Sequence, residues 1–109
     1  MFIILLQLEQ VFDSYWGVNM EKIIERFVDD LQEAMVNNSP VIISRSVNGE
    51  TFDICTTRID FVSSRDGEIE VYDGRGSHII KIDKIEYEEW ENCYTTEADS
   101  ILTTVCLCG

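Results

Sequence analysis

Carboxylates are concentrated in the last third of the chain. Seven of them, Asp83, Glu86, Glu88, Glu89, Glu91, Glu97 and Asp99, stand against only two lysines, Lys81 and Lys84. Residues two apart on a strand share a face and repeat about every 6.7 Å, so we expect Glu86 with Glu88 in one row and Glu89 with Glu91 in the other. Rows of fixed carboxylates can imitate the phosphates of a nucleic acid. The alternative is a solvated sheet face.

Two further groups could enlarge this surface. Glu68 and Glu70 are expected on a nearby strand, about 4.8 Å away, where they would extend a row sideways. Trp90 lies inside the block, and Trp is frequent among interface hot spots, although aromatic residues here could instead cover the open end of the core. The predicted partner-binding residues are therefore Glu86, Glu88, Glu89, Glu91, Trp90, Glu68, Glu70 and Asp73.

Other reactive residue types do not complete a motif. Cys106 and Cys108 would share a strand face, and with Cys55 and Cys93 they could close a zinc site. The paired spacing typical of zinc knuckles is absent, however, and free thiols are the favoured interpretation. The single histidine, His78, has no obvious nucleophile or second ligand and is expected at the surface or in a turn. We therefore expect no metal, no cofactor and no catalytic site.

Charge restricts the classes of partner. The chain of 109 residues has 21 Asp and Glu against 8 Lys and Arg, a formal net charge of −13. Such a balance disfavours direct binding to nucleic acid or to an anionic membrane, because both are polyanions. It favours a basic protein or a cation, or it serves solubility alone. Apolar residues make up 45% of the chain, which is enough for one domain with a real core.

The N-terminal segment allows several interpretations. Its first six residues are apolar, far fewer than the roughly 20 that a membrane span needs, and no basic region precedes them. We therefore expect a cytoplasmic protein whose cysteines are mostly reduced. The hydrophobic spacing of residues 1–19 favours a helix. This segment is either an extension upstream of a domain over residues 20–109 or a dimerisation helix that would make a homodimer.

Local patterns predict a helix followed by short strands. The helix begins after Asn19, a plausible N-cap, carries apolar residues at i, i+3, i+4 and i+7, and stops at Asn37-Asn38-Ser39-Pro40. Asn48-Gly49, Asp66-Gly67 and the segment 73–76 are turn signals. They separate expected strands over residues 41–47, 50–57, 68–73, 77–82, 86–94 and 101–107, and residues 59–62 either extend the second strand or form their own. Ile80 and Ile82 occupy even-numbered positions, whereas Ile85 and Tyr87 occupy odd-numbered positions. A short turn at Asp83-Lys84 would explain this change.

These elements predict an α+β fold, with one or two N-terminal helices before an antiparallel sheet of five to six strands. The element order, with the break in Ile80-Lys81-Ile82-Asp83-Lys84-Ile85, resembles the small SH3-type and Sm-like barrels over about residues 20–91. That resemblance implies a module for oligomerisation or for binding RNA or a peptide. Such a module needs a basic or neutral ligand face, for which the candidates are Arg45, Arg58, Arg65 and Arg75.

In size, charge and single-domain layout, the chain also resembles the acidic anti-CRISPR proteins and other DNA-mimic inhibitors of phages and mobile elements. This resemblance implies a non-enzymatic inhibitor that presents a carboxylate-rich surface to a basic nucleic-acid-binding protein, such as a CRISPR effector nuclease. The acidic block would then lie in the groove that normally holds DNA. This is the leading hypothesis, and the small-barrel module is the alternative.

Overall fold

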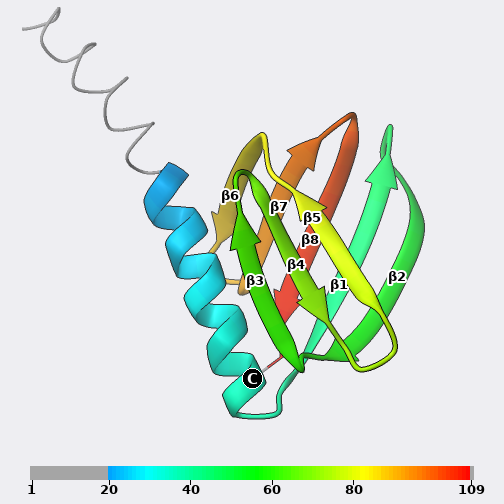
Figure 1. The fold of residues 1–109 in the computed structure, drawn as a ribbon. Coiled ribbons are helices and arrows are strands. Elements are labelled where there is room, and N and C mark those ends of the chain that lie inside the picture. The colour runs from blue at the N-terminus through cyan, green and yellow to red at the C-terminus, as the bar shows by residue number, and fades with distance from the viewer. Residues whose placement is uncertain (1–19, 109) are drawn as a thin grey trace, which may run out of the picture.

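The structure, a computed structural model, describes residues 20–108, and in this part of the chain one helix precedes eight strands (Figure 1). The helix covers residues 20–36. The strands are β1 (Pro40–Val47), β2 (Glu50–Arg58), β3 (Phe61–Arg65), β4 (Glu68–Tyr72), β5 (Ser77–Lys81), β6 (Lys84–Glu88), β7 (Cys93–Ala98) and β8 (Ile101–Leu107). No helix in the described residues is long and apolar enough to cross a membrane.

The strands form two antiparallel sheets. One has five strands in the order β2-β1-β8-β7-β6, and the other has three in the order β3-β4-β5. The predicted α+β class and the order of helix and strands are confirmed. The antiparallel sheet is confirmed as well, but the strands number eight and divide between a five-stranded and a three-stranded sheet. They do not close into an SH3-like or Sm-like barrel.

The helix and the three-stranded sheet lie beside each other against one face of the five-stranded sheet (Figure 1). Apolar side chains from all three meet there, because each element directs one apolar face inward. The most deeply buried are Phe27, Leu31, Val41, Ile43, Ile69, Val71, Ile80, Tyr94 and Val105. The opposite face of the five-stranded sheet is uncovered by these elements and carries exposed apolar side chains such as Ile54 and Leu102.

Several predicted boundaries are confirmed. The helix ends where Asn38 adopts a φ of 55° and the Ser39 amide donates to the Ala34 carbonyl at 2.8 Å, a left-handed cap. The short turn near Asp83 is also present. There the Ile82 amide donates to Gly67 of the three-stranded sheet, and the Asp83 amide donates to Glu97 of the five-stranded sheet. The chain therefore changes sheets at this point. The proposed cap at Asn19 and the alternatives for residues 1–19 lie outside the described residues.

The turns explain both the successes and the errors in the strand predictions. Asn48-Gly49 and Asp66-Gly67 have positive φ angles at both positions, as two-residue hairpins of this twist require. The predicted strand over residues 86–94 is wrong, because β6 ends at Glu88 and β7 begins at Cys93. The intervening turn contains neither Gly nor Pro, and Asn92 alone adopts a positive φ, of 53°.

Candidate protein-interaction surface

The end of β6 and the turn between β6 and β7 together carry four exposed carboxylates, those of Glu86, Glu88, Glu89 and Glu91. Ile85 and Tyr87 point toward the core, so Glu86 and Glu88 point away from it. In the turn that follows, Glu89, Trp90 and Glu91 are exposed. We call the exposed residues Glu86, Glu88, Glu89, Trp90 and Glu91 the acidic turn surface.

Trp90 is 92% exposed, so it does not cover the end of the core, which was one of the two interpretations of the sequence. The aromatic residue that packs against the core is Tyr94. It is fully buried, and its ring lies 4.5 Å from the Phe27 ring and 4.6 Å from the Tyr87 ring. A tryptophan left in water keeps a large apolar surface available, and buried Trp is a frequent anchor of protein interfaces. Its position favours the interpretation of Trp90 as an anchor.

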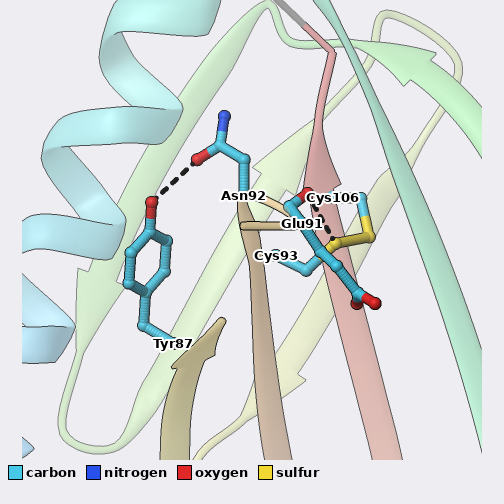
Figure 2. Close-up of a disulfide and its surroundings, with 5 residues drawn as sticks. All are labelled: Tyr87, Glu91, Asn92, Cys93 and Cys106. Atoms are coloured by element: carbon cyan, nitrogen blue, oxygen red, sulfur yellow. Dashed lines mark hydrogen bonds between the residues drawn. A yellow bond between two sulfur atoms is a disulfide. The ribbon is translucent and has the colours of Figure 1, made fainter. Parts of the chain in front are cut away.

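Neighbouring groups hold the C-terminal end of the turn, at Asn92 and Cys93. The Tyr87 hydroxyl donates to Asn92 Oδ1 at 3.0 Å, and the Leu107 amide donates to the Asn92 carbonyl at 3.0 Å. A disulfide joins Cys93, the first residue after the turn, to Cys106 on β8. Figure 2 shows Tyr87 and Asn92 on the side of β7 nearer the helix, whereas the disulfide and the Glu91 carboxylate lie on the other side. The turn is therefore fixed from both faces of the sheet.

The disulfide corrects the prediction that all the cysteines are mostly reduced. Cys93 and Cys106 are register partners on adjacent strands, with Cα atoms 4.1 Å apart, while Cys55 and Cys108 are free thiols. This pairing also removes the four-thiolate zinc site that was considered from the sequence. Disulfides persist mainly in oxidising compartments, so the pairing does not support the expected cytoplasmic location, which stays a prediction.

The carboxylates of the acidic turn surface have no cationic partner. Within residues 20–108, only two basic side chains lie within ion-pair distance of a carboxylate. These pairs are His78 with Asp73 and Lys81 with Asp99. Neither pair includes a residue of this surface. Unpaired like charges close together create a local negative potential that a cationic group can relieve.

Glu68 and Glu70 do not extend the acidic turn surface. Both lie on β4, which pairs only with β3 and β5, whereas β6 belongs to the other sheet. Ile69 and Val71 of β4 are buried, so the two glutamates point to the outer side of the three-stranded sheet. Glu70 also accepts a hydrogen bond from the Tyr72 hydroxyl. The expected sideways row is therefore wrong, because the two segments belong to different layers.

Asp73 is occupied within the fold. Its Oδ1 accepts hydrogen bonds from the backbone amides of Arg75 and Gly76, each at 2.9 Å. Its Oδ2 accepts hydrogen bonds from His78 Nε2 at 2.9 Å and from the Thr57 hydroxyl at 3.1 Å. The bond from His78 and those from the two amides hold the pKa of the Asp73 carboxyl well below its ordinary value. This carboxylate ties the turn and β5 to β2, and its assignment to the partner-binding residues stays a prediction.

His78 was expected at the surface or in a turn, but it lies on β5 with its side chain 23% exposed and bonded to Asp73. Thr57, His78 and Asp73 supply the three group types of a catalytic triad, a hydroxyl, a histidine and a carboxylate, but they are not connected in the order of a triad. In a triad the histidine stands between hydroxyl and carboxylate, whereas here the Thr57 hydroxyl and His78 both bind the same carboxylate oxygen. The histidine therefore does not activate the hydroxyl.

Replacing Asp73 by asparagine should make the stability of the protein depend on pH in a different way. A carboxyl whose pKa is lowered by folding stabilises the fold above its unfolded pKa, here 3.8, and this contribution is lost as the pH falls toward the folded value. We expect D73N to be less stable than the wild type near neutral pH and the difference to shrink in acid. Urea unfolding from about pH 6 to about pH 2.5 measures this.

The control for this test is D53N, which alters an exposed carboxylate on β2 and should show a small difference from the wild type at every pH. A D73N difference that stays constant through the acidic range would contradict the assigned role of the Asp73 carboxylate.

The four candidate basic residues lie on different elements, Arg45 on β1, Arg58 at the end of β2, Arg65 on β3 and Arg75 in the turn after β4. Arg65 and Arg75 lie at opposite ends of the three-stranded sheet, because Arg65 pairs with Glu68 at one end and Arg75 belongs to the turn beyond Tyr72 at the other. The Arg45 guanidinium is engaged with the Ile79 carbonyl at 3.0 Å, between the two sheets. This dispersion does not favour a nucleic-acid-binding module.

Comparisons of the chain with protein-family models, with curated proteins and with solved structures found no match. The geometry and charge of the surface are therefore the basis for inferring its function.

Proposed function

We propose that this chain is a non-enzymatic interaction protein that presents the acidic turn surface to a basic partner protein. The observation that carries the proposal is the 92% exposure of Trp90 beside carboxylates that form no ion pair in the part of the chain that the structure describes. Long-range attraction would speed the encounter. The tryptophan would then supply the apolar contact that charge alone lacks.

Rigidity of the turn supports the same proposal. Binding is weakened when a flexible loop must become ordered. The turn is held by the Tyr87–Asn92 and Leu107–Asn92 hydrogen bonds and by the adjacent Cys93–Cys106 disulfide. Much of the ordering needed for binding is therefore already present in the free protein.

The partner that fits best is a protein whose lysines and arginines bind nucleic acid. Glu86 and Glu88 alternate along β6, so their side chains repeat about every 6.7 Å and offer such a protein a short row of fixed negative charges. This is the class of interaction that the resemblance to anti-CRISPR and other DNA-mimic proteins implies, with a CRISPR effector nuclease as one such partner. Direct contact with nucleic acid or with an anionic membrane is disfavoured by the net charge of −13.

A capture experiment with matched variants tests the proposal. Immobilised wild-type protein, W90A and F61A are incubated at low salt with a cell lysate and with purified nucleic-acid-binding proteins. Trp90 and Phe61 are both exposed aromatics, but Phe61 lies on the other sheet. We expect W90A to weaken binding about 30-fold, the effect of a typical hot spot, and F61A to bind like the wild type.

Added DNA should release the captured proteins, because it competes for the same basic surface. Rising salt should do so as well. If W90A retained the same proteins as tightly as the wild type, the acidic turn surface would not be the binding site. Release by salt but not by DNA would place the contact on a basic surface that does not hold nucleic acid.

A further inference from the structure

A groove of about 200 Å³ lies between the C-terminal half of the helix and the ends of the five-stranded sheet. Its walls include Asp30, Glu33 and Ala34 of the helix, Tyr87 of β6, Asn92 of the turn and Leu107 of β8. Figure 1 shows the end of β8 beside the end of the helix, although β8 is far from the helix in the sequence. Tyr87 and Asn92 place the groove next to the acidic turn surface.

We propose that this groove receives one lysine or arginine side chain of the basic partner, an inference that rests on the proposed function. The occupant must combine an aliphatic stem with a cationic end. Ala34, Leu107 and the Tyr87 ring supply apolar walls for the stem. Long basic side chains bury their methylene groups against such surfaces while their charged ends stay in contact with water.

Negative charge at the helix end favours a cation. The Tyr94 hydroxyl donates to Asp30 Oδ2 at 2.5 Å, which leaves the second oxygen of that carboxylate available. Glu33 is exposed and forms no ion pair within the described residues. The C-terminal end of a helix carries partial negative charge, and the groove lining includes Asn37 and Ser39, just beyond the end of this helix at residue 36. An anionic ligand would meet two carboxylates and this helix end, against the single positive charge of Arg26.

Arg26 lines the groove as well, and its guanidinium lies 4.3 Å from the centre of the Tyr87 ring. This pair shows that the ring already holds a guanidinium by a cation–π contact. Arg26 is one turn before Asp30 on the helix, but it forms no ion pair with Asp30 or Glu33 within the described residues. Both carboxylates therefore remain for an incoming cation. Two carboxylates supply fewer oxygens than Ca²⁺ takes, which favours an organic cation over that metal.

One partner can occupy the groove and the acidic turn surface together. The Tyr87–Asn92 hydrogen bond joins a groove wall to the base of the turn, so a basic side chain in the groove would sit close to the contacts of Trp90. Simultaneous contacts of this kind raise affinity, because the second forms without a new loss of translational freedom.

Titration of the ¹⁵N-labelled protein with a hexaarginine peptide, followed by NMR, tests the inference. We expect amide shifts at Glu33, Asn37 and Asn92, and no such shifts with a hexacitrulline peptide, which has nearly the same shape without the charge. E33Q should weaken binding about three- to tenfold, the loss of one charge-assisted contact at a partly exposed site. E33K should weaken it further.

The matched control is E25Q, which makes the same chemical change at an exposed residue of the same helix outside the groove lining. It should bind hexaarginine like the wild type, and dispersed spectra of each variant verify folding. Shifts at the acidic turn surface alone, or an E33Q affinity equal to that of the wild type, would overturn the groove but leave the proposed function standing. Absence of shifts at both places would overturn both.

Discussion

Reversing Glu86, Glu88, Glu89 and Glu91 to lysine is expected to abolish binding to the basic partner while the fold stays intact. All four side chains are exposed, and none forms an ion pair with another residue of the segment 20–108, so the change breaks no salt bridge there. Each reversal changes the local charge by two units, which turns attraction into repulsion. Like charges facing each other across an interface cost several kcal/mol, so we expect affinity to fall by about a thousandfold or more.

The essential control changes the net charge equally but elsewhere. Glu25, Glu50, Asp53 and Glu68 are also exposed, and lysine at these positions produces the same overall charge away from the turn. Calorimetric titration of a captured partner, at low and at raised salt, compares the two quadruple variants. Equal losses in both would mean that binding follows total charge and not the acidic turn surface. Circular dichroism and urea unfolding verify that each variant is folded.

Local chemistry explains which parts of the fold could be predicted. Asn48-Gly49 and Asp66-Gly67 mark their turns because few residues adopt two successive positive φ angles. The helix could be placed because its apolar positions follow one face and a polar segment with Pro40 ends it. These signals depend on residues that are close in sequence, so they do not depend on which distant segments pack against them.

The division into two sheets depends on contacts between distant segments, which local patterns do not encode. β1 pairs with β8, where Ile43 faces Val105, and nothing in either apolar strand specifies the other as its neighbour. The chain passes from one sheet to the other after Lys81, and the sequence showed this only as a change of the apolar residues from even-numbered to odd-numbered positions. Two short sheets with a helix beside them bury the same inward faces as a barrel, so apolar periodicity could not separate these architectures.

The candidate site was partly predictable for the same reason. Glu86 to Glu91 are close in sequence, so any turn or strand keeps them together. The hydrogen bonds of Asp73 with His78 and Thr57 could not be predicted, because a carboxylate in a sequence does not reveal whether it is already bonded. The Cys93–Cys106 pair became visible only with the unmarked turn at Asp99-Ser100, whose φ angles are 55° and 66°, because a hairpin centred there places the two cysteines opposite each other.

Reduction of the Cys93–Cys106 disulfide is expected to lower the free energy of unfolding by about 3 kcal/mol, as for a closed loop of about 15 residues. The two cysteines are 13 residues apart in the sequence, and cutting the link lets the unfolded chain explore many more conformations. Urea unfolding with and without a reductant measures the difference. The double variant C55S/C108S, which retains the disulfide and removes the free thiols, should show the same dependence on reductant.

Binding supplies a second readout of the same bond. The disulfide lies beside the acidic turn surface, so its loss should loosen the turn and weaken partner binding even where the protein remains folded, because ordering the turn then opposes association. Thiol labelling of the unreduced protein should find only Cys55 and Cys108 reactive. If all four cysteines reacted, or if reductant changed neither stability nor binding, the disulfide would not be what holds the turn in place, and the hydrogen bonds of Asn92 would have to do so alone.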